Sequence, residues 1–194
     1  MAEVLLHIYR GTLAENIIRG DIVVTDRQGQ LMSGCGDIQK LTYMRSAAKP
    51  IQALVGVEAG VLEAYNIGQE ELAIFCASHN GQSFHVAAVR SVLAKIGLRE
   101  QNLLCGADYS FNPQIRAKMI EEGLAKSPLF NNCSGKHALM LAVCQQMGWS
   151  IGDYYLPEHP LQQAILAKVA FYAGLDKEQI TIGVDGCGVP VFAL

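Results

Sequence analysis

The sequence has little charge and no long apolar run, and both shortages exclude whole classes of protein. Charged residues make up 17% of the 194 residues and the formal net charge is −3, so no basic stripe is available for nucleic acid. No apolar stretch reaches the ~20 residues that a membrane-spanning helix requires. The N-terminal region carries Arg10 and polar residues where a secretory signal is apolar. We therefore expect a cytoplasmic protein with neither nucleic-acid nor membrane partners.

A disulfide framework is not indicated either, although the chain contains six cysteines. Without a secretory signal we expect free thiols, most of them buried as small apolar side chains. Internal repeats, low-complexity segments and Pro/Ser-rich linkers are absent, so we expect residues 1–194 to form a single domain. The chain ends soon after a predicted turn at residues 185–190, and we predict no closing helix or strand there. We therefore expect a domain that is truncated at its C-terminal end.

What the sequence does contain is 51% hydrophobic residues, enough for a substantial core. Segments of β character predict strands at residues 3–9, 22–25, 31–35 and 180–184, with a further short candidate at 41–44. Apolar residues at helical spacing predict helices at residues 50–62, 84–96, 112–122 and 161–173. The apolar run at residues 72–77 fits a helix or a strand equally well. The mixture predicts an α+β fold in which antiparallel sheet packs with helices.

The segment at residues 45–50 (RSAAKP) places a hydroxyl and an amine three residues apart. Positions i and i+3 of a helix share a face, so Lys49 could take the proton of the Ser46 hydroxyl. Lysine acts as a base only where burial or a neighbouring cation lowers its pKa, and Arg45 is such a cation. The plainer interpretation is an N-cap serine followed by a solvated lysine, and these residues alone leave both open.

Three more polar clusters follow apolar segments, at residues 77–81 (ASHNG), 131–137 (NNCSGKH) and 184–190 (VDGCGVP). The first can present a hydroxyl and an amide to a cleft. The second crowds the start of a predicted helix, where unpaired backbone amides bind anions. The third packs glycines and a proline at a strand end, as happens next to a ligand or another backbone. Each cluster alone is also compatible with an ordinary turn.

The cluster at residues 131–137 is not a Walker phosphate loop. That motif requires a glycine where this chain has Phe130, and a serine or threonine where it has His137. Nucleotide phosphate binding by this route is therefore not expected.

In order and spacing, the four clusters together resemble the rhizobial-type L-asparaginase II family, whose fold is similar to serine β-lactamases and penicillin-binding proteins. The resemblance covers the whole chain, which corresponds to roughly the N-terminal half or more of the family's length. It implies hydrolysis of L-asparagine to L-aspartate and ammonia through an acyl intermediate, by a protein that forms a homodimer.

The resemblance also implies roles for individual residues. The implied catalytic residues are Ser46, Lys49 and Ser78. The implied zinc ligands are Cys133, Lys136 and Cys187, with water as a fourth ligand. The positions that match polar residues of the same cleft, for substrate binding, are Arg45, Asn80, His137 and Asp185. In this scheme Ser46 attacks and Lys49 takes its proton, Ser78 relays a proton to the leaving nitrogen, and the lysine that partners Ser78 lies past Leu194.

Two other functions stay open. The Ser-x-x-Lys and Ser-x-Asn pattern also fits a β-lactam-reactive serine protein, although the cluster at residues 131–137 and the lack of an export signal count against it. The early end of the chain fits a non-catalytic fragment that binds zinc or a partner chain. Which serine attacks, and whether asparagine is preferred over glutamine, are also left open.

Overall fold

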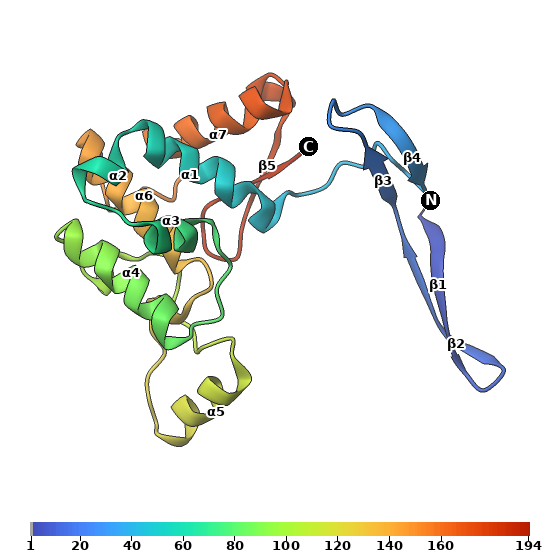
Figure 1. Ribbon diagram of the computed structural model, residues 1–194, viewed down its shortest axis with the longest axis horizontal. Coiled ribbons are helices and arrows are strands. Elements are labelled where there is room, and N and C mark those ends of the chain that lie inside the picture. Colours follow the sequence, from blue (N-terminus) through green and yellow to red (C-terminus); the bar gives the residue numbers. More distant parts are fainter. Residues whose placement is uncertain (1) are drawn as a thin grey trace. The chain divides into compact units, whose positions relative to one another are not determined.

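The computed structural model describes residues 2–194, in two compact units (Figure 1). The first unit extends to Thr42 and the second spans Tyr43–Leu194. Helices and small antiparallel two-stranded sheets make up the structure, as the predicted α+β class requires. No helix within the described residues combines the length and the apolar character that crossing a bilayer needs. That both units belong to a single domain stays a prediction.

The first unit consists of two antiparallel ribbons. Its strands are β1 (Glu3–Arg10), β2 (Leu13–Gly20), β3 (Ile22–Thr25) and β4 (Leu31–Cys35). The predicted strands at 22–25 and 31–35 are confirmed, and Asp26 fixes the turn between them by accepting hydrogen bonds from the backbone N–H groups of Gln28 and Gln30, both at 2.8 Å. Strand β2 was missed, because its polar residues Glu15 and Asn16 interrupt the apolar pattern of a ribbon whose side chains are largely exposed.

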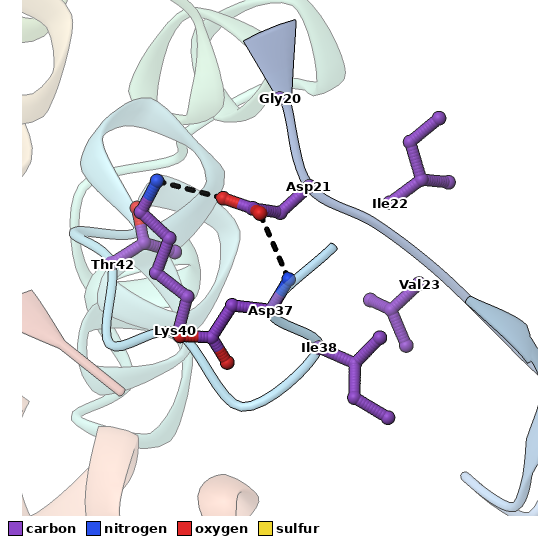
Figure 2. A pocket seen from close by; sticks show the side chains of 8 residues that line it. All are labelled: Gly20, Asp21, Ile22, Val23, Asp37, Ile38, Lys40 and Thr42. Atoms are coloured by element: carbon purple, nitrogen blue, oxygen red, sulfur yellow. Dashed lines mark hydrogen bonds and ion pairs between the residues drawn. The ribbon is translucent and has the colours of Figure 1, made fainter. Parts of the chain in front are cut away.

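Asp21 fixes the segment that follows β4 (Figure 2). Its carboxylate accepts hydrogen bonds from Lys40 Nζ at 2.8 Å and from the backbone N–H of Asp37 at 2.9 Å. The bond from Lys40 is the main reason that the pKa of Asp21 is lowered. Gly36 has φ 77°, and a Cβ at this position would collide with the Asp21 carboxylate, so glycine allows the close approach.

The second unit is built around helices. In chain order these are α1 (Lys49–Glu58), α2 (Val61–Ala64), α3 (Gln69–Cys76), α4 (Ser83–Lys95), α5 (Pro113–Glu121), α6 (Ser134–Met147) and α7 (Pro160–Ala173). Helices α1, α3, α4 and α7 all pack against α6, whereas α5 lies apart from them (Figure 1). Every residue of α6 from Ser134 to Cys144 is buried, which is typical of a central helix with no solvent face.

Two glycines set how closely the helices approach α6. A Cβ on Gly135 would collide with the carbonyl oxygen of Ile74 in α3, and a Cβ on Gly56 of α1 would collide with the Leu139 side chain. A third glycine ends α1: Gly60 has φ 73°, so the predicted helix at 50–62 is in fact α1 followed by the short α2. The ambiguous run at 72–77 is helical as far as Cys76 and belongs to α3, and Ala77 follows the helix in an extended conformation.

The end of the chain forms strand β6 (Pro190–Ala193), which pairs antiparallel with β5 (Thr181–Val184). The prediction that no strand closes the chain was therefore wrong, because the four residues of β6 are too few to show a period. All four are buried, so they also lack the polar alternation of a half-exposed strand. The predicted short strand at 41–44 is reduced to a single bridge between Tyr43 and Ala193.

Candidate active site

Lys49 joins two serines from distant parts of the chain. Its Nζ donates to Ser78 Oγ at 2.8 Å, to the Ala77 carbonyl oxygen at 2.6 Å and to the Asn132 carbonyl oxygen at 3.3 Å. The Ser78 Oγ lies 2.6 Å from the Ser46 Oγ. The three residues with predicted catalytic roles therefore converge, and Ser78 stands between the amine and Ser46.

This order differs from the expected contact between Lys49 and Ser46. Lys49 is only 2% exposed, because its side chain extends into the unit towards the carbonyl oxygens at the end of α3 and before α6. Ser46 lies on a 3₁₀ turn (Arg45–Ala48) and is exposed. The amine therefore reaches Ser46 through the hydroxyl of Ser78.

The surroundings of Lys49 favour its neutral form. Its hydrogen-bond partners are two carbonyl oxygens and a hydroxyl, none of which carries a charge. Burial lowers the pKa of Lys49 most, the positive charge of Lys136 lowers it further, and Cys133 opposes the shift. An amine with a lowered pKa is neutral, and so able to accept a proton, at a lower pH than a solvated lysine.

Arg45, next to Ser46, has an unusual backbone. Its φ is 49°, in the left-handed region that costs a non-glycine residue on the order of 1 kcal/mol or more. Its guanidinium lies 3.2 Å from Asp185 Oδ1, on the turn that follows β5. The pair links the serine turn to a second cluster of reactive side chains.

This second cluster, which we call the thiol cluster, consists of Cys133, Lys136, Asp185 and Cys187. The ligand atoms of Cys133, Asp185 and Cys187 all lie within 4.8 Å of one another. Lys136 Nζ donates to Cys187 Sγ at 3.3 Å and lies 3.8 Å from Asp185 Oδ2. The three predicted zinc ligands thus gather in one place, with a carboxylate beside them.

Local structure explains how the thiol cluster forms. Cys133 is the N-cap of α6 and Lys136 lies in its first turn. Cys187 sits in a tight turn closed by backbone hydrogen bonds between Asp185 and Val189 and between Gly188 and Asp185. The interaction with Cys187 is the main reason that the pKa of Cys133 is lowered to about 6, and the same interaction raises the pKa of Cys187. Two soft thiols, an amine and a carboxylate form a donor set that suits zinc.

The other two residues predicted to bind substrate are Asn80 and His137. Asn80 follows Ser78, and its side-chain Oδ1 is buried without a hydrogen-bond partner. Its carbonyl oxygen accepts a hydrogen bond from Ser110 Oγ at 2.7 Å, which holds the loop. His137 is completely buried behind the thiol cluster, with its Nδ1 2.7 Å from the Tyr154 hydroxyl oxygen.

Three functional candidates escaped sequence reasoning. His79 Nδ1 accepts from the backbone N–H of Gly81 at 3.1 Å, so its Nε2 carries the proton and donates to Ser134 Oγ at 2.8 Å. This bond ties the loop that carries Ser78 to the start of α6. His79 and Ser134 stand inside two of the polar clusters, which marked them without indicating a role. Tyr154 has no sequence signal at all.

Comparison with known families gives one finding for nearly the whole chain. The family model described as L-asparaginase II matches residues 6–194. The matched region contains both the serine and lysine cluster and the thiol cluster. No curated protein matches the chain.

Proposed function

This chain belongs to the L-asparaginase II family, and from that premise we propose that it hydrolyses the side-chain amide of L-asparagine to L-aspartate and ammonia. The observation that carries the proposal is the continuous contact from Lys49 to Ser78 and from Ser78 to Ser46. An amine with a lowered pKa at one end and an exposed hydroxyl at the other is what nucleophilic amide hydrolysis needs.

The contacts of Lys49 support one direction of proton transfer. A neutral amine has two protons and one lone pair. Once Lys49 is neutral, the carbonyl oxygens of Ala77 and Asn132 accept its two protons, and the hydrogen bond that the charged amine donates to Ser78 is reversed, so that the lysine lone pair accepts the hydroxyl proton of Ser78. The Ser78 oxygen can then accept the proton of Ser46. In this arrangement Ser46 loses its proton to Lys49 through Ser78.

The reaction then proceeds in two halves. The Ser46 oxygen attacks the carboxamide carbon while its proton passes to Lys49. The C–N bond breaks as the same proton returns through Ser78 to the leaving nitrogen, which departs as ammonia. A water molecule, deprotonated along the same route, hydrolyses the resulting β-aspartyl ester and frees Ser46.

Zinc is part of the proposal, with Cys133, Lys136 and Cys187 as ligands and Asp185 beside them. Their close spacing and their chemistry fit the ion, since thiolates are among the ligands that zinc prefers. Bound zinc would supply positive charge that holds both sulfurs and the lysine in their deprotonated forms. The chain's own contribution is Asp185, which pairs with Arg45 and so holds that guanidinium beside Ser46.

We further propose a serine β-lactamase-like fold, a cytoplasmic location and a homodimer. These three proposals rest on the resemblance of the four motif clusters to the family.

The test is ammonia release from L-asparagine by purified wild-type protein and by the Ser46→Ala and Lys49→Ala variants. Loss of release in both variants is expected, with Ser33→Ala and Lys118→Ala, two exposed residues that are not members of the site, as matched controls. Acid quenching followed by mass analysis should locate the acyl group on the peptide that contains Ser46. Unchanged turnover in Ser46→Ala and Lys49→Ala would exclude the mechanism, and labelling by a fluorescent penicillin would favour the β-lactam-reactive alternative.

A further inference from the structure

An open hollow of about 340 Å³ lies beside the serine pair of the candidate active site. Its lining combines one of the two serines and a predicted substrate-binding asparagine with three residues at the start of α4, namely Ser78, Asn80, Gln82, Phe84 and His85. Ser46 Oγ lies 2.6 Å from Ser78 Oγ, so a small substrate whose carboxamide contacts Ser46 can extend into this hollow. The hollow is therefore a candidate binding place for the part of the substrate that does not react.

The imidazole of His85 is held in one orientation on this lining. Its Nδ1 accepts a hydrogen bond from the backbone N–H of Gln82 at 3.2 Å. The ring stacks with that of His79, at 5.3 Å between centroids and 22° between planes, and its centroid lies 4.0 Å from that of Phe84. Because these contacts restrict rotation of the ring, the second nitrogen, Nε2, keeps a fixed position.

The contact with Gln82 also assigns the proton of the ring. The Gln82 N–H can only donate, so Nδ1 is an acceptor and a neutral His85 carries its proton on Nε2. Burial lowers the pKa of His85, which favours this neutral form. The side chain is half-buried, and within residues 2–194 its Nε2 contacts no hydrogen-bond acceptor. The Nε2–H is therefore available to a ligand.

The chemistry of the lining suits a carboxylate. None of the residues that line the hollow is acidic, so an anion there meets no like charge among them. The Nε2–H of His85 and the side-chain amide of Gln82 are hydrogen-bond donors. A neighbouring hollow that shares Phe84 and His85 is lined instead by the acidic Glu70 and mainly apolar residues. Of these two hollows, the one beside Ser78 is the better place for an anion.

We propose that this hollow receives the α-carboxylate of the amino-acid substrate, and that His85 binds it by a hydrogen bond from Nε2–H. The inference rests on the proposed function, because it assumes that the carboxamide of the same molecule contacts Ser46. The α-carboxylate takes no part in bond breaking, so we expect this contact to be equally strong in the ground state and in the transition state. Losing it should raise KM and leave kcat unchanged.

Two substitutions of His85 separate substrate binding from local structure. In His85→Asn the side-chain oxygen can replace Nδ1 as the acceptor for Gln82, but the Nε2–H donor is lost. In His85→Gln the longer amide can place a donor near the former Nε2, but the acceptor for Gln82 is lost. We expect KM for L-asparagine to rise about 10–100-fold in His85→Asn, the range for a hydrogen bond to a charged group, and much less in His85→Gln. His7→Asn, the same change on the exposed strand β1, is the control and should behave as wild type.

Truncated ligands identify the group that His85 binds, by calorimetry on Ser46→Ala protein. Succinamate is asparagine without its α-amino group, and β-alaninamide is asparagine without its α-carboxylate. Adding His85→Asn should weaken the binding of L-asparagine and of succinamate by the same factor of about 10–100. The affinity for β-alaninamide should be low from the start and should not fall further.

Three results would overturn the proposal. One is an unchanged KM in His85→Asn, and another is a larger rise in His85→Gln than in His85→Asn, which would mean that the bond to Gln82 matters and the Nε2–H does not. The third is equal weakening for succinamate and β-alaninamide. If His85→Asn fails to fold, the NMR signal of the His85 Nε2–H in Ser46→Ala protein, identified by its loss in His85→Gln, decides instead. Succinamate should move this signal and β-alaninamide should not, and a signal that neither ligand moves would also overturn the proposal.

The proposed function and this inference fail separately. A protein that releases no ammonia but binds L-asparagine more weakly after His85→Asn would refute the proposed function and leave this inference standing. Ammonia release whose KM does not respond to His85→Asn would do the reverse. A protein that neither binds nor hydrolyses L-asparagine would refute both.

Discussion

Two lysines of this protein are buried to the same degree but have different neighbours. Lys49 is 2% exposed and Lys136 is 3% exposed. Lys49 contacts carbonyl and hydroxyl oxygens, whereas Lys136 contacts the Cys187 sulfur and the Asp185 carboxylate. The same side chain therefore stands once among uncharged acceptors and once among groups that ionise.

The difference shows that burial alone does not decide what a lysine can do. Among neutral oxygens, burial lowers the pKa of Lys49 more than the opposing influence of Cys133 and Cys187 raises it. Around Lys136, the neighbouring thiol and carboxylate are themselves the ligand types that metal ions take from proteins. One lysine is thus suited to proton transfer and the other to a metal centre.

The largest expected effect is a loss of activity when Lys49 is replaced, and it should distinguish Lys49 from Lys136. Lys49→Met keeps the side-chain volume and removes the base, so kcat/KM for ammonia release should fall about 10²–10⁴-fold. Lys136→Met should weaken zinc binding instead, measured by chelator competition. Comparable losses of zinc affinity in both variants would break the distinction.

A second prediction concerns His79, whose contact with Ser134 ties the loop that carries Ser78 to the start of α6. Burial lowers the pKa of His79 to about 4, with smaller effects from His85 and Lys49. Between about 4 and the ordinary value of 6.5 the unfolded chain binds more protons than the folded one, so the free energy of unfolding falls as the pH drops through this window.

His79→Gln should remove at most about 3 kcal/mol of this pH dependence. The measurement is urea unfolding at several pH values, with His7→Gln on the exposed strand β1 as the control. An identical slope in wild type and His79→Gln would show that this histidine is not held neutral.

A third prediction tests how closely α6 packs against α3. Both helices position the site, because Lys136 lies in α6 and Ala77, whose carbonyl oxygen contacts Lys49, is the C-cap of α3. Gly135→Ala forces a Cβ into the Ile74 carbonyl oxygen and should reduce the free energy of unfolding by about 1–3 kcal/mol. Gly152→Ala, at an exposed glycine with no close neighbour, should be nearly neutral. Equal denaturant midpoints for the two variants would argue against close packing at Gly135.

The smallest effect is expected at Arg45. Arg45→Gly relieves the left-handed backbone and loses an ion pair whose arginine is 70% exposed, so the two contributions nearly cancel. The free energy of unfolding, measured by thermal unfolding, should change by less than about 1 kcal/mol. The KM for asparagine should rise if the guanidinium binds substrate. A large loss of stability would mean that the Arg45–Asp185 pair has a structural role.

The sequence predicted those parts of the fold that have a strong local signal. The β-branched run at Ile22–Thr25 and the helical stripe of α4 were placed to within a residue. Strand β2 and strand β6 were missed, because one is interrupted by polar residues and the other is too short and too buried to show a period. Helix α3 stayed ambiguous for a similar reason, since its last residues are all apolar.

The sequence predicted which residue clusters form the site, but not which side chains contact one another within it. Each cluster is a local run of polar residues that the sequence displays. The contact of Lys49 with Ser78 joins residues 29 positions apart, and that of His137 with Tyr154 joins residues 17 apart, and neither separation leaves a periodic pattern. The order of the relay and the contact between His137 and Tyr154 therefore depend on packing around α6.

The most direct test of the account is the pH dependence of kcat/KM for asparagine. If Lys49 is the base, activity should rise with pH along a limb whose apparent pKa lies below the ordinary lysine value of about 10.4, because burial favours the neutral amine. Lys49→Arg, which cannot lose its proton, should lack this limb. A limb at or above the ordinary value, or one that persists in Lys49→Arg, would contradict proton transfer to Lys49.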